Sequence, residues 1–231
     1  CNIFTNLRLK GLVLEGSGVI KPPSVHEKMI EFIGDSITSG YGLPNEAEDD
    51  YAWLTAERLG FEHSQIARTG ICLKTGAEND MAGGMGMESR YFQSEMNWSD
   101  ATNTIYQNWG FATPSPDMIV INIGTNDNSR VDHTEFQALY TNFLANLRTR
   151  HPNAKIIAMG TLGGYLVAET QNAVNLRNQA GDNSVFFLDT TGWVDINNPE
   201  HFGATDKIHP TLNGHTVIAD RLTTALGQYL Q

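Results

Sequence analysis

The chain has 231 residues, of which 40% are apolar and 18% charged, so it is long enough for one large α/β domain with a buried core. Its 26 acidic residues outnumber its 15 basic residues, and the formal net charge is −11. Because nucleic acid and anionic lipid are also negatively charged, this balance argues against both as partners. No apolar run approaches the roughly 20 residues that a membrane-spanning helix needs, which excludes an integral membrane protein.

Cys1 and Cys72 are the only cysteines. Two thiols exclude both a disulfide-rich scaffold and a four-thiolate zinc site. They leave open a single bridge between the two, which only an oxidising compartment would keep. The sequence also leaves the oligomeric state open.

Residues 1–26 are expected to form a strand and a linker ahead of the main domain. Residues 6–15 have the pattern of a strand, the Gly-Ser-Gly at 16–18 breaks it, and the Pro-Pro pair at 22–23 is typical of a linker. A lone strand needs a partner for its backbone groups. It is either an edge strand of the main domain or the last strand of a β-domain upstream of this chain.

Residues 27–231 alternate between strand and helix patterns and are expected to form the main domain. Apolar runs typical of a parallel sheet covered on both faces mark the predicted strands Met29–Ile33, His63–Ala67, Met118–Ile123, Lys155–Met159 and Val185–Leu188. Apolar residues at helical spacing predict helices over 132–150 and 211–230. We therefore expect one three-layer α/β/α domain built on a five-stranded parallel sheet, with right-handed crossover connections.

One segment interrupts this alternation. Residues 76–110 are polar and Gly-rich and contain four of the seven methionines. Structureless loops of that length are uncommon in compact domains and often border a functional site, so we expect this one to line the site. An ordinary insertion with a short helix or two is the alternative.

Four short polar clusters stand where a parallel sheet binds its ligands, at the carboxyl ends of strands or just before the last helix. They are residues 34–40, 68–70, 124–127 and 206–210. The first and third follow predicted strands, so they must lie at the same edge of the sheet. The fourth is expected to join them there.

Together these clusters hold the parts of an acyl-transfer site. Ser36, expected at the start of a helix, is a nucleophile that needs a base. His209 is the candidate base, and Asp206 would orient its imidazole and stabilise the imidazolium. The backbone N–H groups of Ser36 and Gly70 and the side-chain amide of Asn126 are candidate donors to an oxyanion. Each feature alone is common, since a serine after a strand is usually a helix cap, but the full set in this order favours a serine hydrolase.

Other polar residues near these clusters have structural interpretations. Asp35 and Asp127 are expected to brace turns, and His215 is expected to bond to backbone inside the last helix. His201 is expected in a surface loop.

Aromatic residues near the strand ends suggest contacts to a substrate. Trp109, Tyr165 and Trp193 follow or precede predicted strands and could stack on sugar rings. Packing within the fold is the alternative for each.

Two rival functions use the same residues differently. In a metal-dependent phosphoesterase, Asp35, Asp127, Asp206, His201 and His209 would hold a divalent ion. No His-Glu-x-x-His motif or closely spaced pair of histidines supports that site. A carbohydrate-binding module with a disused catalytic site is disfavoured, because the serine, the base and the donors are all present.

The motifs Gly-Asp-Ser-Ile-Thr at 34–38, Gly-Thr-Asn-Asp at 124–127 and Asp-x-x-His-Pro at 206–210, with Gly70 between the first two, resemble the motif blocks of the SGNH (GDSL-type) hydrolase superfamily. The resemblance covers about residues 27–231. It implies a flavodoxin-like sheet, with Ser36 as nucleophile, His209 as base with Asp206 behind it, and Gly70 and Asn126 as oxyanion donors. It also implies no metal and no organic cofactor.

Residues 31–42, 51–53 and 120–127 are similar to carbohydrate esterase family two. That resemblance implies removal of acetyl groups from xylan and other plant polysaccharides. It also implies an N-terminal β-sandwich joined by a Pro-containing linker, which residues 1–26 match. The match departs where Arg68-Thr69 stands in place of the serine that often precedes the oxyanion glycine. We therefore expect a secreted serine esterase acting on acetylated carbohydrate, with an SGNH esterase for lipid, aryl or thioester substrates as the alternative.

Overall fold

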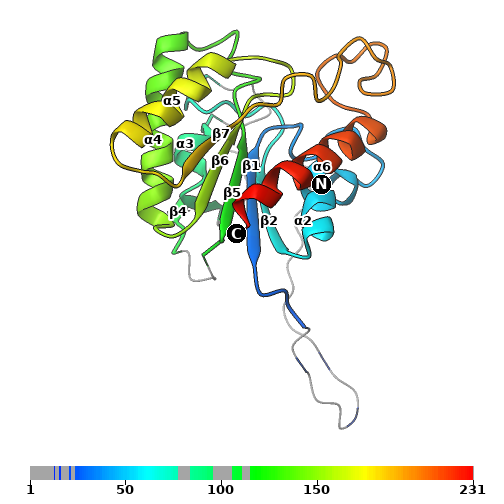
Figure 1. Cartoon of the computed structure of the whole chain (residues 1–231), viewed down its shortest axis with the longest axis horizontal. Helices are drawn as coiled ribbons and strands as arrows, with labels where there is room; N and C mark the ends of the chain where they lie inside the picture. The colour runs from blue at the N-terminus through cyan, green and yellow to red at the C-terminus, as the bar shows by residue number, and fades with distance from the viewer. Residues whose placement is uncertain are drawn as a thin grey trace.

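The computed structural model describes residues 24–77, 84–95, 106–110 and 115–230, together with Val13, Gly16 and Lys21. A five-stranded sheet with the order β2-β1-β5-β6-β7 lies at the centre of this part of the chain (Figure 1). Its strands are β1 (Met29–Gly34), β2 (Glu62–Ala67), β5 (Met118–Asn122), β6 (Lys155–Met159) and β7 (Val185–Leu188). Every neighbouring pair in the sheet is parallel. The predicted five-stranded parallel sheet is confirmed, and each strand bound lies within one residue of its predicted position.

Helices cover both faces of the sheet (Figure 1). One face packs against α2 (Tyr51–Leu59) and α6 (Leu212–Leu226), and the other against α3 (Met87–Arg90), α4 (His133–Arg150) and α5 (Val167–Gln179). Short turns of helix, α1 (Glu46–Asp49) and η2 (Gly227–Tyr229), adjoin α2 and α6. Successive residues of β5 alternate between the two apolar clusters, because neighbouring side chains of a strand point to opposite faces. The predicted three-layer α/β/α architecture is confirmed.

The helix boundaries follow from their capping residues. Asp132 begins α4 by accepting hydrogen bonds from the backbone N–H groups of Thr134 and Glu135. The Glu135 side chain pairs with Lys74. At α6, the Thr211 hydroxyl accepts from the backbone N–H of Gly214. Both helices therefore begin where the sequence predicted, since a capping side chain supplies an acceptor that the first turn lacks.

The segment 76–110 contains more regular structure than the sequence predicted. Its described part holds α3 and an antiparallel pair, β3 (Gln93–Glu95) with β4 (Tyr106–Asn108). Tyr91, between α3 and β3, attaches this segment to the core because its hydroxyl forms hydrogen bonds with Glu31 and His151. The small sheet was not predicted.

Several predictions about the N-terminal residues lie outside the described structure. They concern the strand at 6–15, the Pro-Pro pair at 22–23 and Cys1. Cys72 is completely buried. None of the described helices combines the length and the apolar character that crossing a membrane requires.

Arg148, in the last turn of α4, ties this helix to two loops. Its Nε donates to both carboxylate oxygens of Asp182, at 3.0 and 3.1 Å. Its Nη1 donates to the backbone carbonyls of His151, Pro152 and Ala154, ahead of β6. The pair with Asp182 is largely buried, and Arg177 reaches the same carboxylate only at 3.4 Å. Loss of Arg148 would therefore remove the closest cation from Asp182 and the donor from several carbonyl groups.

We expect Arg148→Met to lower the free energy of unfolding by about 3 kcal/mol, because the buried Asp182 carboxylate keeps only the longer contact to Arg177, at 3.4 Å, and three backbone carbonyls lose their donor. Urea unfolding measures the change, and Arg221→Met, at an exposed position of α6, is the matched control. A loss below about 1 kcal/mol, the value of a surface ion pair, would contradict this role.

Candidate active site

The structure brings together residues from two distant parts of the chain at the carboxyl edge of the sheet. Ser36 stands in the turn after β1, and His209 stands in the loop before α6. The Ser36 Oγ lies 2.8 Å from the His209 Nε2, although 173 positions separate the two residues. A hydroxyl and an imidazole are thus placed for direct proton transfer.

A compact turn holds Ser36. The backbone N–H of Ile37 donates to the Asp35 Oδ1 at 3.0 Å, and the N–H of Ser39 donates to the Asp35 carbonyl at 3.0 Å. Gly34 allows the turn to fold tightly, because a Cβ there would lie 2.1 Å from the Thr38 Oγ1. Ser36 therefore leaves the sheet in a turn that its neighbours fix in place.

The expected helix start at Ser36 is wrong. Residues 36–40 form turns, and the first helical residue after β1 is Glu46. Gly40 has φ +69°, a left-handed conformation that interrupts a right-handed helix. A Cβ at Gly40 would also lie 2.3 Å from the Glu46 carbonyl oxygen, so the chain packs closely there.

Asp206 orients His209. Its Oδ2 lies 2.7 Å from the His209 Nδ1, and its Oδ1 accepts hydrogen bonds from the backbone N–H groups of Ile208 and His209. Desolvation opposes ionisation of this carboxyl, but these hydrogen bonds outweigh it and hold the pKa of Asp206 below its ordinary value. An ionised carboxylate only accepts hydrogen bonds, so the His209 Nδ1 carries the proton and the Nε2 is left to accept from Ser36.

The two other predicted donors stand on either side of Ser36. Gly70 follows β2 and Asn126 follows β5, and both of these strands pair with β1. Gly70 has φ +75°, which a residue with a Cβ rarely adopts. The Asn126 Nδ2 donates to the Ile71 carbonyl at 3.0 Å, so the two loops are joined and the amide is fixed with its second hydrogen available.

Two buried carboxyl groups brace these loops, as the sequence predicted. The Asp127 side chain accepts from the backbone N–H groups of Leu73 and Lys74, which ties the loop after β5 to the loop after β2. Asp35 braces the turn of Ser36. Burial raises the pKa of Asp35 to about 7, and the nearby charge of Asp127 adds to the effect.

The residues of the metal-binding alternative do not gather. Asp35 and Asp127 accept hydrogen bonds from backbone, and the His201 Nδ1 accepts from the backbone N–H of Asp195. In the part of the chain that the structure describes, no group of three or more His, Cys, Asp or Glu side chains is arranged to hold a metal ion. The geometry favours the serine–histidine interpretation of these residues.

His215 joins the last helix, α6, to its neighbour α2 in the same layer. The residue is completely buried, and its Nδ1 accepts from the backbone N–H of Tyr51, the first residue of α2. The sequence predicted a backbone bond within the last helix, and the structure shows a backbone bond to α2 instead. Burial, with the nearby His209, lowers the pKa of His215 to about 4.

Two of the three aromatic candidates lie near the carboxyl edge of the sheet. Tyr165 follows β6 and Trp193 follows β7, both half-buried. Trp193 packs against the apolar cluster that α2 and α6 cover. Tyr165 accepts a hydrogen bond at its carbonyl from the Thr161 hydroxyl. The contact of Tyr165 and Trp193 with a substrate stays a prediction.

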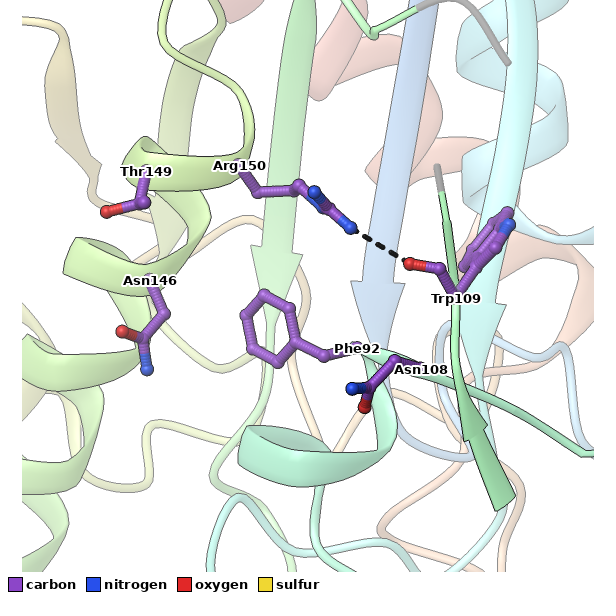
Figure 2. A pocket seen from close by; sticks show the side chains of 6 residues that line it. All are labelled: Phe92, Asn108, Trp109, Asn146, Thr149 and Arg150. Atoms are coloured by element: carbon purple, nitrogen blue, oxygen red, sulfur yellow. Dashed lines mark hydrogen bonds between the residues drawn. The ribbon is translucent and has the colours of Figure 1, made fainter. Parts of the chain in front are cut away.

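Trp109, the third aromatic candidate, lies elsewhere, and its contact with a sugar ring stays a prediction. It lines a pocket of about 420 Å³ with Phe92, Asn108, Asn146, Thr149 and Arg150. Figure 2 shows Arg150 reaching from α4 to the Trp109 carbonyl, a distance of 2.9 Å. Because α4 starts at the carboxyl edge and its 18 residues span about 27 Å, its last residue Arg150 lies toward the amino ends of the strands. The β3–β4 pair carries Trp109 to that side.

Tyr41 is a residue of the site that the sequence did not reveal. Its ring centroid lies 4.8 Å from that of His209, with the planes tilted by 49°. The residue belongs to the same turn as Ser36, because its backbone N–H donates to the Ser36 carbonyl at 3.0 Å. Only its place five positions after Ser36 could have indicated this contact.

Comparisons with known proteins agree with this geometry. The sequence model of the GDSL-like Lipase/Acylhydrolase family matches residues 32–217. The cellulase/esterase CelE of Acetivibrio thermocellus is 30% identical, over 91% of this chain and 27% of that protein. An acetylxylan esterase / glucomannan deacetylase of Cellvibrio japonicus is 27% identical, over 99% of this chain and 64% of that protein. The chain thus spans less than two thirds of the length of each of these curated relatives.

Solved structures show the same fold. A family two carbohydrate esterase from Clostridium thermocellum, in complex with cellohexaose, is 30% identical with a TM-score of 0.71, over 91% of this chain and 67% of that one. An acetyl xylan esterase from the rumen bacterium Butyrivibrio proteoclasticus is 27% identical with a TM-score of 0.72, over 93% of this chain and 67% of that one. The resemblance to family two carbohydrate esterases is confirmed by these relatives.

The buried His215 makes stability depend on pH. The pKa of His215 is about 4 in the folded protein and about 6.5 when unfolded, so between pH 4 and 6.5 the unfolded chain binds the proton and the folded protein largely does not. The stability contributed by the neutral imidazole is complete above pH 6.5 and is lost as the pH falls toward 4. We expect a loss of about 2 kcal/mol from this residue between pH 7 and pH 4.5.

The variant His215→Gln isolates this contribution, because glutamine can still accept from the Tyr51 N–H but does not titrate. Urea unfolding of both proteins at pH 7 and 4.5 measures the difference. Asp35 and Asp50, whose pKa values are raised by burial, act in the opposite direction but are common to both proteins. Equal changes with pH in the two proteins would show that His215 is not the group responsible.

Proposed function

The chain belongs to the GDSL-like lipase/acylhydrolase family, and on this premise we propose that it is a serine esterase that releases acetate from acetylated sugars or polysaccharides. The observation that carries the proposal is the hydrogen-bonded series from the Ser36 Oγ through His209 to the Asp206 carboxylate. A serine hydroxyl becomes a nucleophile only with a base that takes its proton, and this series supplies one.

The first half of the reaction forms an acyl-enzyme. The Ser36 Oγ attacks the acetyl carbonyl carbon while its proton passes to the His209 Nε2, and Asp206 stabilises the imidazolium. The carbonyl oxygen becomes an oxyanion that accepts hydrogen bonds from the N–H groups of Ser36 and Gly70 and from the Asn126 amide. Collapse of this intermediate breaks the ester bond, and His209 gives its proton to the departing sugar hydroxyl.

The second half releases acetate. A water molecule gives a proton to the His209 Nε2 and attacks the acetyl carbon on Ser36. The same three donors hold the second oxyanion, and its collapse returns the proton from His209 to the Ser36 Oγ. All proton transfers pass through His209, so the cycle needs only these side chains and water.

The choice of a carbohydrate substrate is supported by the relatives. One is named an acetylxylan esterase / glucomannan deacetylase, and a family two carbohydrate esterase 30% identical to this chain has been solved with cellohexaose bound. Polysaccharides of this kind lie outside the cell, so we also propose that the protein is secreted.

Ser36→Ala tests the nucleophile. Acetate release from acetylated xylan and acetylated glucomannan should fall by at least about 10⁴-fold, because the variant lacks the hydroxyl that lies 2.8 Å from the His209 Nε2. Mass spectrometry after treatment with a serine-directed sulfonyl fluoride should find one label on the native protein and none on the variant. Ser39→Ala, in the same turn, is the matched control and should keep the label on Ser36.

Two outcomes would contradict the proposal. Near-normal acetate release by a folded Ser36→Ala variant would exclude Ser36 as the nucleophile. Loss of activity of the native protein on treatment with a chelator would instead favour a metal-dependent hydrolase.

Asn126→Ala tests the oxyanion donors. Removal of one such donor typically lowers kcat by about 10²- to 10³-fold, because the donor acts on the charged intermediate more than on the bound ester. Steady-state kinetics should therefore show a large fall in kcat with little change in KM. Asn172→Ala, at an exposed position of α5, is the matched control. A fall in kcat of less than threefold would remove Asn126 from the oxyanion site.

A further inference from the structure

The turn that holds the nucleophile also holds an exposed aromatic ring. Tyr41 is tied to this turn because its backbone N–H donates to the Ser36 carbonyl, at 3.0 Å. Glycines stand on both sides of it, and both adopt left-handed conformations, with φ +69° at Gly40 and +87° at Gly42. The two glycines adopt backbone conformations that other residues rarely take, and this path of the chain sets the direction in which the Tyr41 ring leaves the turn.

The Tyr41 ring lies against the catalytic histidine but is not buried by it. The two ring centroids are 4.8 Å apart, yet 43% of Tyr41 remains exposed. Among the residues that the structure describes, none forms a hydrogen bond with the Tyr41 hydroxyl. The exposed part of the ring and its hydroxyl are therefore open to a bound molecule.

Three exposed apolar residues are close to His209, one in space and two in sequence. The described residues include seven large apolar side chains that are exposed, and three of them lie beside this histidine in space or in sequence. Tyr41 contacts its ring, Ile208 precedes it and is 47% exposed, and Leu212 follows three positions later and is 48% exposed. Apolar groups gathered at one place on a charged surface indicate a contact site.

The proposed mechanism places the leaving group of the substrate beside Tyr41. His209 gives its proton to the departing oxygen, so the group that leaves must lie against the Nε2 of the same imidazole that Tyr41 contacts. A pyranose ring presents C–H groups on its faces and hydroxyls at its edge, which suits an aromatic ring with an exposed face.

We propose that Tyr41 binds the sugar ring that carries the acetyl group and so selects sugar esters over simple acetates. This inference rests on the proposed function and names a residue that determines its specificity. The Tyr41 ring would form one wall of the leaving-group site, with Ile208 and Leu212 extending the apolar rim. It acts on the substrate directly, and not by holding the His209 ring.

A binding experiment tests the inference without turnover. In the Ser36→Ala background, xylohexaose and cellohexaose are titrated by calorimetry against the protein with Tyr41 and against Tyr41→Ala and Tyr41→Phe. We expect Tyr41→Ala to weaken binding of at least one of these oligosaccharides about tenfold and Tyr41→Phe to retain it, because the ring and not the hydroxyl makes the contact. Leu176→Ala, an exposed apolar residue of α5, is the matched control and should bind as before.

Kinetics separate this role from a structural one. In the protein with Ser36 intact, Tyr41→Ala should lower kcat/KM for acetylated xylo-oligosaccharides about tenfold more than for trifluoroethyl acetate, whose leaving group has no ring. Equal losses on both esters would show that Tyr41 acts only by holding His209, and would overturn the inference. Unchanged oligosaccharide binding in Tyr41→Ala, or binding by neither oligosaccharide in the parent protein, would overturn it as well.

Failure of the proposed function has a different signature. It would appear in the protein with both Ser36 and Tyr41 intact, as an absence of acetate release from acetylated oligosaccharides. Failure of the inference about Tyr41 appears only in the comparison between variants.

Discussion

The site depends on the register of β1 with its two neighbours. Gly34, the last residue of β1, pairs with Ala67 on one side and with Asn122 on the other. All three strands therefore end at the same level, and the loops that follow them start side by side. A shift of one residue would move a loop by about 3.3 Å and reverse its side chains, which is enough to separate Ser36 from the donors of the neighbouring loops. The two central apolar clusters hold this register, so the core on both faces of the sheet supports the site.

Much of this arrangement could be predicted because it follows from local pattern. Buried parallel strands appear as continuous apolar runs such as Met118–Asn122, and the order of a strand followed by a polar cluster places that cluster at the carboxyl edge. The pairing of Asp206 with His209 is also local, since the two residues are three positions apart. The contact between Ser36 and His209 is not local, and only the combination of all the clusters indicated it.

The features that the sequence predicted wrongly or did not predict depend on contacts between distant segments or on backbone conformation. The turn at Ser36 looked like a helix start because a serine after a strand is usually a helix cap. The left-handed φ of Gly40 and its close packing against Glu46 appear only in the structure. Trp109 precedes the predicted strand at 118–123 in the sequence, and the β3–β4 pair, which was not predicted, carries it to the side of the sheet near Arg150. The partner of His215, on α2, is 164 positions away, so no local pattern could reveal it.

A second serine–histidine contact, between Ser115 and His151, shows by comparison which features let His209 act as a base. The Ser115 Oγ lies 2.9 Å from the His151 Nδ1, a distance close to that between Ser36 and His209. Burial lowers the pKa of His151, and the charges of Arg150 and Arg148 lower it further, so this imidazole resists the proton that a general base must accept. Its Nε2 bonds to the Tyr91 hydroxyl, whereas the second nitrogen of His209 bonds to a carboxylate. The difference lies in the group behind the histidine, because a carboxylate stabilises the imidazolium that forms during attack and neighbouring arginines oppose it.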